Sequence, residues 1–394
     1  MIQRSVTRMI EPKLRFPEFK DSWNNYKIED MFDRVGTPVD LDDTQTYREI
    51  GIRSHGKGIF HKEETTATEI GNKRVFWVEP DCFVVNIVFA WERAVAKTTE
   101  KENGMIASHR FPMYKPKKNI VDLDYITEYF ITKRGQNVLI LASPGGAGRN
   151  KTLGQKEFAK SVVKLPSPPE QQKIAEFLST IDTVIGKQKE TVSAWEERKK
   201  GVMQKLFNQE VRFKADDGNE FPEWEEKKLG DILTYEQPTK YIVKSTEYND
   251  KYKIPVLTAG QSLILGYTDE MNGVYNASST NPVIIFDDFT TSFHWIDFSF
   301  KVKSSAMKLL TLNDDKCNFL YVYNAMQFID YVPMSHSRQW ISTYSMFKVP
   351  VPCLAEQQKI ADCLSSLDEV IEKQKATLAA WEELKKGLLQ QMFV

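Results

Sequence analysis

Residues 170–207 read EQQKIAEFLSTIDTVIGKQKETVSAWEERKKGVMQKLF, and this stretch decides the fold because the chain contains it twice. Residues 356–393 read EQQKIADCLSSLDEVIEKQKATLAAWEELKKGLLQQMF, with a constant offset of 186 residues and 24 of 38 positions identical. Such a long internal repeat indicates a duplicated structural unit. We therefore expect two equivalent halves, each with one copy.

Both copies lack proline, and apolar residues recur in them at alternating steps of four and three. This pattern predicts a coiled coil. Gln188, Gln374, Lys199 and Lys385 also fall on the seam, where polar residues specify register and partner. We predict that the two copies pair with each other; two separate bundle helices are the alternative. The predicted pairing residues are Ile174, Leu178, Ile181, Ile185, Val192, Trp195, Ile360, Leu364, Leu367, Ile371, Leu378 and Trp381.

The formal net charge of the chain is −1, so a nucleic-acid site would have to be a local basic patch. The four cysteines form no C-x2-C pair, which favours neither a zinc site nor a disulfide framework. The first residues include no apolar signal segment, and no apolar run approaches the ~18 residues of a membrane span. These features predict a cytoplasmic protein that does not bind membranes.

Each repeated stretch closes a larger unit. A Phe-Pro-Glu motif with a nearby tryptophan precedes both globular regions, at Phe16 to Trp23 and at Phe221 to Trp224. The regions that follow are unlike in sequence. We expect a globular domain over residues 1–165, a long helix over 166–208, a second globular domain over 209–350 and a second long helix over 351–394.

The two unlike regions share an expected order of elements: strands, a helix, a loop and a last strand that ends at proline. The first region is predicted to contain strands at 47–52, 74–78, 83–90 and 158–165 and a helix with Leu123, Ile126 and Phe130 on one face. The second region is predicted to contain strands at 254–257, 283–286, 296–302 and 346–351 and a helix between Phe319 and Ile329.

Two such halves can close around a pseudo-two-fold axis. The predicted fold is α+β, with two mixed α/β globular domains separated by two long antiparallel coiled-coil helices. Two different globules at opposite ends of a rigid spacer suit two different targets on one linear ligand. Duplex DNA with separated half-sites is such a ligand.

The paired EQQKIA, KQK, AWEE and KKG segments, together with the Phe-Pro-Glu motifs, resemble the specificity subunit of type I restriction–modification systems over essentially the whole chain. Residues 51–63 and 255–290 also resemble its target recognition domains. The resemblance implies that each globular domain reads one half of a bipartite asymmetric site in double-stranded DNA. It further implies that the paired helices set the spacer and dock two adenine methyltransferase subunits, and that ATP-dependent restriction subunits join the complex.

The sequence shows no catalytic motif. Asn281-Pro282-Val283-Ile284 lacks the second proline and the aromatic residue of an adenine methyltransferase, and the loop 145–152 has asparagine where a phosphate loop requires glycine. Asp287-Asp288 lacks a third carboxylate, and the histidines lack metal-ligand spacing. We expect a non-catalytic chain without a metal site, with S-adenosylmethionine, ATP and Mg²⁺ bound by partner subunits.

Loops that mix basic, small polar and aromatic residues are the candidate DNA contacts, because arginine, lysine and hydroxyl groups suit phosphates and base edges. A plain polar turn is the alternative at each of these loops. The candidates are Arg53, His55, Lys57, Arg93, His109, Arg110, Arg149 and Lys151 in the first region, and Thr290, Thr291, His294, Lys301, Lys303, Ser304, Lys308 and Arg338 in the second.

Two other classes of function are open. A coiled-coil adaptor that joins two protein-binding domains fits the near-zero net charge, and salt-dependent DNA binding would distinguish it. A self-contained nuclease or methyltransferase is disfavoured by the absent motifs.

Overall fold

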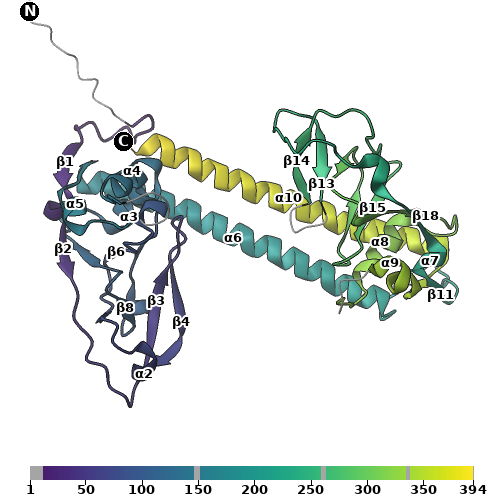
Figure 1. Ribbon diagram of the computed structural model, residues 1–394, viewed down its shortest axis with the longest axis horizontal. Coiled ribbons are helices and arrows are strands. Elements are labelled where there is room, and N and C mark those ends of the chain that lie inside the picture. Colours follow the sequence, from purple (N-terminus) through teal and green to yellow (C-terminus); the bar gives the residue numbers. More distant parts are fainter. Residues whose placement is uncertain (1–11, 146–150, 259–262, 334–337, 394) are drawn as a thin grey trace, which may run out of the picture. The chain divides into compact units, whose positions relative to one another are not determined.

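The computed structural model describes residues 12–145, 151–258, 263–333 and 338–393 (Figure 1). The chain divides into two compact units. The first unit consists of residues 1–189 and 376–394, and the second unit consists of residues 190–375. Each unit therefore combines one globular region with the beginning of one long helix and the end of the other.

The first unit contains a four-stranded sheet with the order β2-β9-β6-β7, a second sheet with the order β4-β3-β8-β5 and the pair β1-β10. Its elements are β1 (Asn24–Lys27), α1 (Ile28–Met31), β2 (Phe32–Val35), β3 (Thr46–Ile52), β4 (Ile59–Thr66), α2 (Ala67–Ile70), β5 (Val75–Trp77), β6 (Phe83–Val85), η1 (Ala90–Glu92), β7 (Val95–Lys97), η2 (Glu100–Glu102), β8 (Ile106–Ser108), β9 (Met113–Pro116), α3 (Leu123–Ile131), α4 (Lys133–Leu141), α5 (Gln155–Lys160) and β10 (Val162–Leu165).

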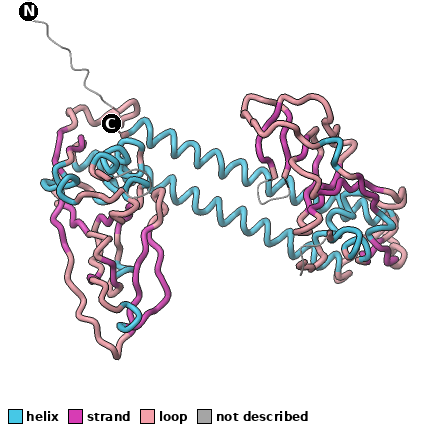
Figure 2. Tube along the Cα trace, in the orientation of Figure 1, coloured by secondary structure: helices cyan, strands magenta, loops and turns pink. Residues whose placement is uncertain are grey.

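The second unit contains sheets with the orders β12-β18-β15-β16 and β14-β13-β17 and the pair β11-β19. Figure 2 shows these strands in magenta and the helices in cyan. Its elements are β11 (Glu225–Lys228), α7 (Leu229–Ile232), β12 (Leu233–Glu236), η3 (Pro238–Tyr241), β13 (Ile254–Leu257), β14 (Ile264–Thr268), β15 (Val283–Asp287), β16 (Phe293–Ile296), β17 (Lys301–Val302), β18 (Met307–Leu312), α8 (Phe319–Gln327), α9 (Gln339–Ser342), η4 (Tyr344–Met346) and β19 (Lys348–Val351).

The unlike sequences of the two globular regions form sheets with the same strand order. β2, β9, β6 and β7 correspond to β12, β18, β15 and β16, and all neighbours in both sheets are antiparallel. Phe83 pairs with Tyr114, as Ile284 pairs with Leu310. This register makes Phe83 equivalent to Ile284, and four residues later it makes Ile87 equivalent to Asp288.

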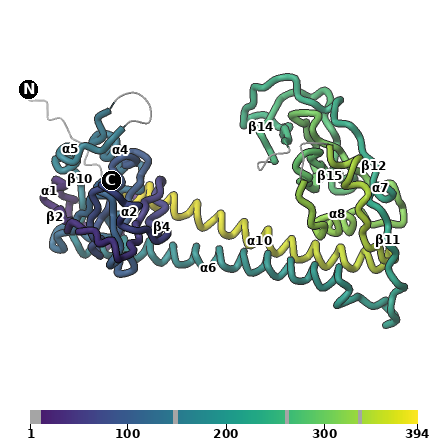
Figure 3. The backbone as a smooth tube through the Cα atoms, turned by 60° about the horizontal axis from the view of Figure 1, so that its bottom comes forward, coloured from purple at the N-terminus to yellow at the C-terminus, as the bar shows by residue number. Residues whose placement is uncertain are grey.

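The repeated sequence forms α6 (Pro168–Phe207) and α10 (Leu354–Met392). The parts of α6 and α10 that belong to each unit run antiparallel, side by side (Figures 1 and 3). In the first unit Asp182 pairs with Lys385 at 2.8 Å and Lys189 pairs with Glu382 at 2.9 Å. Later residues of α6 thus meet earlier residues of α10, as antiparallel pairing requires.

The second unit repeats these two ion pairs with the partners exchanged. Lys199 pairs with Asp368 at 2.6 Å, and Lys375 pairs with Glu196 at 3.0 Å. Each of the four residues is the counterpart, 186 positions away, of a residue in the first pair set. The seam residues predicted to pair are all buried or half-buried. The fold class is confirmed.

A buried arginine–glutamate pair fixes the start of each long helix. Arg15 donates to the Glu170 carboxylate from Nε at 2.7 Å and from Nη2 at 2.8 Å. Arg212 donates in the same two-point manner to Glu356, at 3.1 and 2.8 Å. Glu170 and Glu356 are 1% and 0% exposed, so these charge-assisted bonds lie away from solvent.

The glutamine that follows each of these glutamates joins the helix to its globular region. Gln171 is fully buried, donates to the Pro166 carbonyl and accepts from the backbone N–H of Asp122, the N-cap of α3. Gln357 makes the corresponding bonds to the Pro352 carbonyl and the N–H of Asn318, the N-cap of α8. The repeated Glu-Gln pair is therefore a structural joint in both units.

The far ends of the long helices also pack equivalently. Phe393 lies 5.0 Å from Tyr125 between ring centroids, and Phe207 lies 5.6 Å from Tyr321. These contacts extend the aromatic core that α3 and α8 bury in their respective units. The same globular surface thus holds the start of one long helix and the end of the other.

Several predicted strands differ from the observed elements. The expected strand 83–90 ends at Val85, because the Asn86 side chain accepts the N–H of Val88 and turns the backbone. Phe158 begins no strand; it is a buried residue of α5, and β10 follows only at Val162. The expected strand 296–302 is interrupted between β16 and β17, and Met346 belongs to η4. Other elements, among them β2, β4, β9, β14, β18 and α4, were not predicted.

Candidate nucleic-acid interface

The loop between β6 and β7, residues 86–94, gathers the basic segments of the first unit. The N–H of His55 donates to the Glu92 carbonyl at 2.7 Å, and the N–H of Gly56 donates to the Arg93 carbonyl at 2.9 Å. Gly56 has φ +67°, and a Cβ there would lie 2.7 Å from Ile131. Only glycine therefore fits between Arg93 and the end of α3.

Two further segments reach the same loop. The N–H of Ile87 donates to the Arg110 carbonyl at 3.0 Å, and the N–H of Leu153 donates to the Ile87 carbonyl at 2.8 Å. Lys151 lies over the Trp91 ring, 5.8 Å from its centroid. We call residues 86–94 with these tethered segments the first hub. Four stretches that are distant in sequence meet in it.

The candidate side chains of the first hub differ in exposure. Arg53, His55 and Lys57 are exposed and alternate along the turn between β3 and β4, and His109 and Arg110 are exposed as well. Arg93 and Lys151 are half-buried, and Arg149 lies outside the described residues. The first hub thus presents basic side chains from several loops, which is the composition expected of a surface that contacts DNA.

The loop between β15 and β16, residues 288–292, occupies the equivalent place in the second unit. The N–H of Asp288 donates to the Ala306 carbonyl at 3.0 Å, and the N–H of Gln339 donates to the Asp288 carbonyl at 2.8 Å. These bonds match those of Ile87 in the first hub. We call residues 288–292 with the segments around Ala306 and Gln339 the second hub.

A buried ion pair lies under the second hub. The Lys308 Nζ is 3.4 Å from the Asp288 carboxylate and 4.8 Å from the centroid of the Tyr235 ring. The other carboxylate oxygen of Asp288 accepts the N–H of Trp340 at 2.8 Å. Lys308 and Asp288 are 0% and 2% exposed. Asp288 therefore fixes the second hub with its side chain as well as its backbone.

Two lysines predicted to contact DNA have their charges engaged inside the second unit. Lys301 is 2% exposed, pairs with Glu270 at 3.0 Å and donates to the Asn272 carbonyl. Lys308 pairs with Asp288. Lys308 lies on β18, an inner strand of its sheet, whereas Lys301 lies on β17, the last strand of its sheet, and is enclosed by Glu270 and Asn272. Neither lysine side chain is therefore exposed to a ligand.

The other candidates of the second unit are more accessible. Thr290, Ser304 and Arg338 are exposed, and Lys303 is half-buried with its Nζ over the Tyr248 ring. Thr291 is buried and has φ +60° at the tip of the second hub. His294 is half-buried, and this burial lowers the pKa of its imidazole. Hydroxyl and basic side chains are mixed here, whereas basic side chains dominate the first hub.

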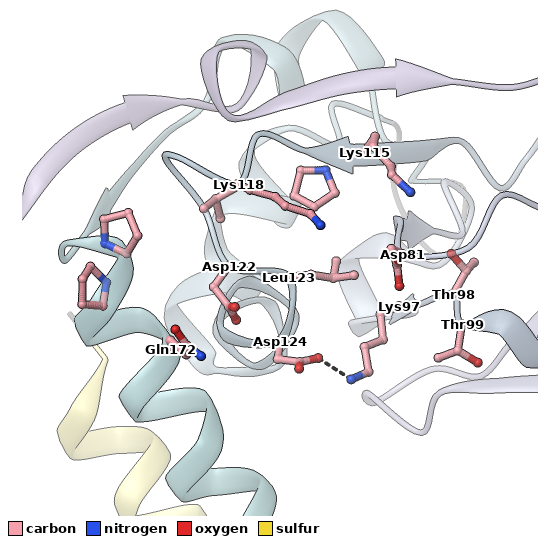
Figure 4. Close-up of a pocket in the computed structure, with 14 residues that line it drawn as sticks. Asp81, Lys97, Thr98, Thr99, Lys115, Lys118, Asp122, Leu123, Asp124 and Gln172 are labelled. Carbon is pink, nitrogen blue, oxygen red and sulfur yellow. Dashed lines mark hydrogen bonds and ion pairs between the residues drawn. The ribbon is translucent and has the colours of Figure 1, made fainter.

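A separate cleft of about 530 Å³ lies beside the start of α6 in the first unit (Figure 4). Three lysines and three aspartates are among its lining residues. Lys97 forms an ion pair with Asp124 in it, and Lys115 donates to the Pro80 carbonyl at 2.7 Å. Because its charges balance, the cleft favours neither anions nor cations, and we assign it no role.

Within the described ranges, no group of three or more His, Cys, Asp or Glu side chains is placed to hold a metal ion. Asp287 accepts the N–H groups of Phe289 and Thr290, and Asp288 is held by Lys308 and Trp340. Both carboxylates therefore organise the second hub. None of the helices that the structure describes is long and apolar enough to cross a membrane.

The fold and the two hubs define a duplicated α/β protein whose units share one framework and differ in the loops that it presents. The family described as "Type I restriction modification DNA specificity domain" matches residues 20–193 and again residues 222–380. The chain therefore belongs to the type I restriction–modification DNA specificity domain family.

Curated relatives in this family are named as specificity subunits. The EcoR124I/EcoR124II specificity subunit of Escherichia coli is 50% identical over 154 residues, which is 38% of either chain. The MjaVIII specificity subunit of Methanocaldococcus jannaschii is 27% identical over 257 residues, 58% of this chain and 60% of the relative. The chain thus spans about two fifths to three fifths of these relatives' lengths.

Solved structures support the fold. The crystal structure of a type I restriction–modification S subunit from M. genitalium has a TM-score of 0.58 at 16% identity, and the match covers 98% of this chain and 99% of that one. A chain from a structure of type I restriction–modification complex assembly has a TM-score of 0.53 at 14% identity, covering 95% and 98%. At these identities the likeness extends to the fold alone.

Proposed function

We propose that this chain is the non-catalytic DNA-recognition subunit of a type I restriction–modification complex, and that each unit reads one half of a bipartite asymmetric site in double-stranded DNA. The observation that carries the proposal is the double match to the specificity-domain family, one match for each unit. The hubs support it, because equivalent backbone positions present different side chains. Equal frameworks with unlike surfaces suit two unlike half-sites.

The paired helices set the spacing between the half-sites and dock two adenine methyltransferase subunits. α6 has 40 residues and so spans ~60 Å at 1.5 Å per residue. Two copies of one subunit require two identical surfaces, and the repeated helices offer them. Ala194 and Glu197 are exposed on α6, and their counterparts Ala380 and Glu383 are exposed on α10. Restriction subunits join the assembled complex, which acts on DNA in the cytoplasm.

Gly201 and Gly387 locate the docking surface more closely. Apart from its chain neighbours and the backbone of its own helix, a Cβ at Gly201 would meet no described atom within 4 Å, and one at Gly387 would meet only the Gln391 side chain at 3.9 Å. Packing inside the chain therefore does not require glycine, although glycine within a helix costs ~1 kcal/mol relative to alanine. A partner helix that approaches closely accounts for the glycine in both copies of the repeated helix. Gly201→Leu with Gly387→Leu should abolish methyltransferase copurification, whereas the two alanine variants should retain it.

The function is tested by coexpressing the chain with its methyltransferase and mapping methylated adenines in substrate DNA. The proposal predicts adenine methylation at a split site and binding that weakens steeply with salt, because phosphate contacts release counterions. Methylation at an undivided site, or complex formation without DNA binding, would contradict it. The isolated chain should show no activity with S-adenosylmethionine or with magnesium.

A further inference from the structure

A groove of about 930 Å³ in the first unit lies between the start of α4 and the two long helices. Its lining carries six basic side chains and only two acidic ones, an excess of four positive charges. The basic residues are Arg93, Lys133, Arg134, Lys189, Lys385 and Lys386. A concave surface with this charge attracts a polyanion.

Half of the basic residues are already neutralised within the chain. Lys385 pairs with Asp182, Lys189 pairs with Glu382, and Lys386 pairs with Glu383, three residues earlier in the same helix. Lys133 and Arg134 have no acidic partner among the residues that the structure describes. Both belong to the first turn of α4, which contains no acidic residue. Their charges are therefore available to a ligand.

The groove begins at the first hub. Arg93 belongs to both, because its carbonyl accepts the N–H of Gly56 and its Nη1 donates to the Ile131 carbonyl at 3.2 Å. Ile131 lines the groove and also packs against Gly56. The turn that carries Arg53, His55 and Lys57 thus adjoins the groove. A duplex that contacts this turn has its backbone beside Arg93.

The second unit has no basic residues at the positions equivalent to Lys133 and Arg134. The N-caps Asp122 and Asn318 set an offset of 196 residues between α3 and α8, so Lys133 and Arg134 correspond to Ile329 and Asp330. Thr132 corresponds to Phe328, whose ring stacks on Phe207 with centroids 5.6 Å apart. An aromatic contact in the second unit thus replaces a polar lining in the first. Two identical methyltransferase subunits would need matching sites in both units, so they do not account for this groove.

We propose that the groove binds the sugar–phosphate backbone of the duplex next to the half-site read by the first unit, with Lys133 and Arg134 as its phosphate contacts. The inference rests on the proposed function and deepens it. Lysine and arginine bind phosphates without regard to sequence, and each contact adds to the salt dependence of binding. The first unit therefore holds DNA beyond its half-site, and the second unit does not do so at this position.

The test uses the full methyltransferase complex with the double variant Lys133→Ala/Arg134→Ala. The slope of log affinity against log salt should be shallower by about 2 in the variant. When the salt rises from 50 to 200 mM, the wild-type complex should therefore lose about tenfold more affinity than the variant complex. The methylated sequence should stay the same. The charge-preserving variant Lys133→Arg/Arg134→Lys should keep the wild-type slope, and Ile329→Ala/Asp330→Ala at the equivalent positions should not reduce it.

The possible failures are distinguishable. An unchanged slope and affinity in the Lys133→Ala/Arg134→Ala complex, with normal site recognition by the wild type, overturns the groove alone. Loss of methyltransferase copurification in that variant shows that the groove holds protein and also overturns it. A wild-type complex that recognises no site overturns the proposed function, and the inference with it.

Discussion

The two units have the same joints and different hubs. Glu170 and Glu356 accept arginines in the same two-point geometry, and the glutamines after them make the same backbone bonds. Ile87 and Asp288, at equivalent points of the hubs, share only their backbone bonds. The side chain of Asp288 adds a buried ion pair that Ile87 cannot form. The two units therefore repeat particular side-chain bonds in their joints, whereas their hubs repeat only backbone bonds and differ in the side chains that they carry.

The largest effect is expected from removing the glutamate of a joint. Glu356→Ala leaves the Arg212 guanidinium, 17% exposed, without its carboxylate and should destabilise the chain by about 4 kcal/mol. Glu170→Ala should cost somewhat less, because Glu356 also accepts the Trp224 indole N–H at 2.9 Å. Denaturant unfolding of both variants measures the difference. A negligible loss in either unit would contradict the equivalence of the joints.

The next effect concerns the second hub alone. Lys308→Met leaves the Asp288 carboxylate buried without its cation and should cost about 3 kcal/mol. Because Asp288 also holds Trp340, methylation mapping should show weakened recognition of the second half-site only. The double variant Asp288→Asn/Lys308→Met should recover most of the stability. Equal weakening of both half-sites would show that the hubs are not independent.

The sequence was sufficient to predict the paired helices, because a heptad pattern depends on spacings that can be counted directly. It did not show the partners of the joint glutamates. Arg15 and Arg212 precede them by 155 and 144 residues, so the constant offset of the repeat does not extend to these arginines. A shared Arg-Phe pair at Arg15 and Arg212 was the available signal.

The candidate interface was predictable only in part. The basic segments around His55, Arg93 and Arg110 were selected individually, but their meeting depends on a strand order that composition does not reveal. Lys301 and Lys308 belong to a run of basic and hydroxyl residues that resembles a surface strand. Both are nevertheless buried, and Glu270 and Asp288, 31 and 20 residues earlier in the chain, supply the opposite charges.

A smaller effect compares the two seam lysines. Lys199→Met should cost ~0.5 kcal/mol, since its partner Asp368 is half exposed to solvent. Lys385→Met should cost more, about 1–2 kcal/mol, because Lys385 also lies 3.4 Å from the Glu128 carboxylate, which is 19% exposed. Thermal unfolding of the two variants compares these losses. Equal losses would show that Glu128 does not depend on Lys385.

The smallest effect is a pH dependence confined to the first unit. Burial raises the pKa of the Glu128 carboxyl, and Lys385 only partly opposes this rise. A carboxyl whose pKa is raised in the folded state stabilises the fold at pH values below the ordinary glutamate pKa. This stabilisation is lost as the pH rises through the pKa of the folded state. Glu128 corresponds to Asn324 in the second unit, so Glu128→Gln introduces a similar uncharged amide. This variant should therefore raise the melting temperature more at pH 8 than at pH 4. A gain independent of pH would contradict this assignment.

The most direct measurement replaces residues 229–351, which run from α7 to β19, with residues 28–165, which run from α1 to β10. The resulting chain carries the first globular region in both units. Sequencing of methylated adenines then shows the site that its complex recognises. We predict a bipartite site made of two inverted copies of the first half-site. Retention of the original second half-site, or methylation of an undivided site, would contradict the claim that equal frameworks carry independent readers.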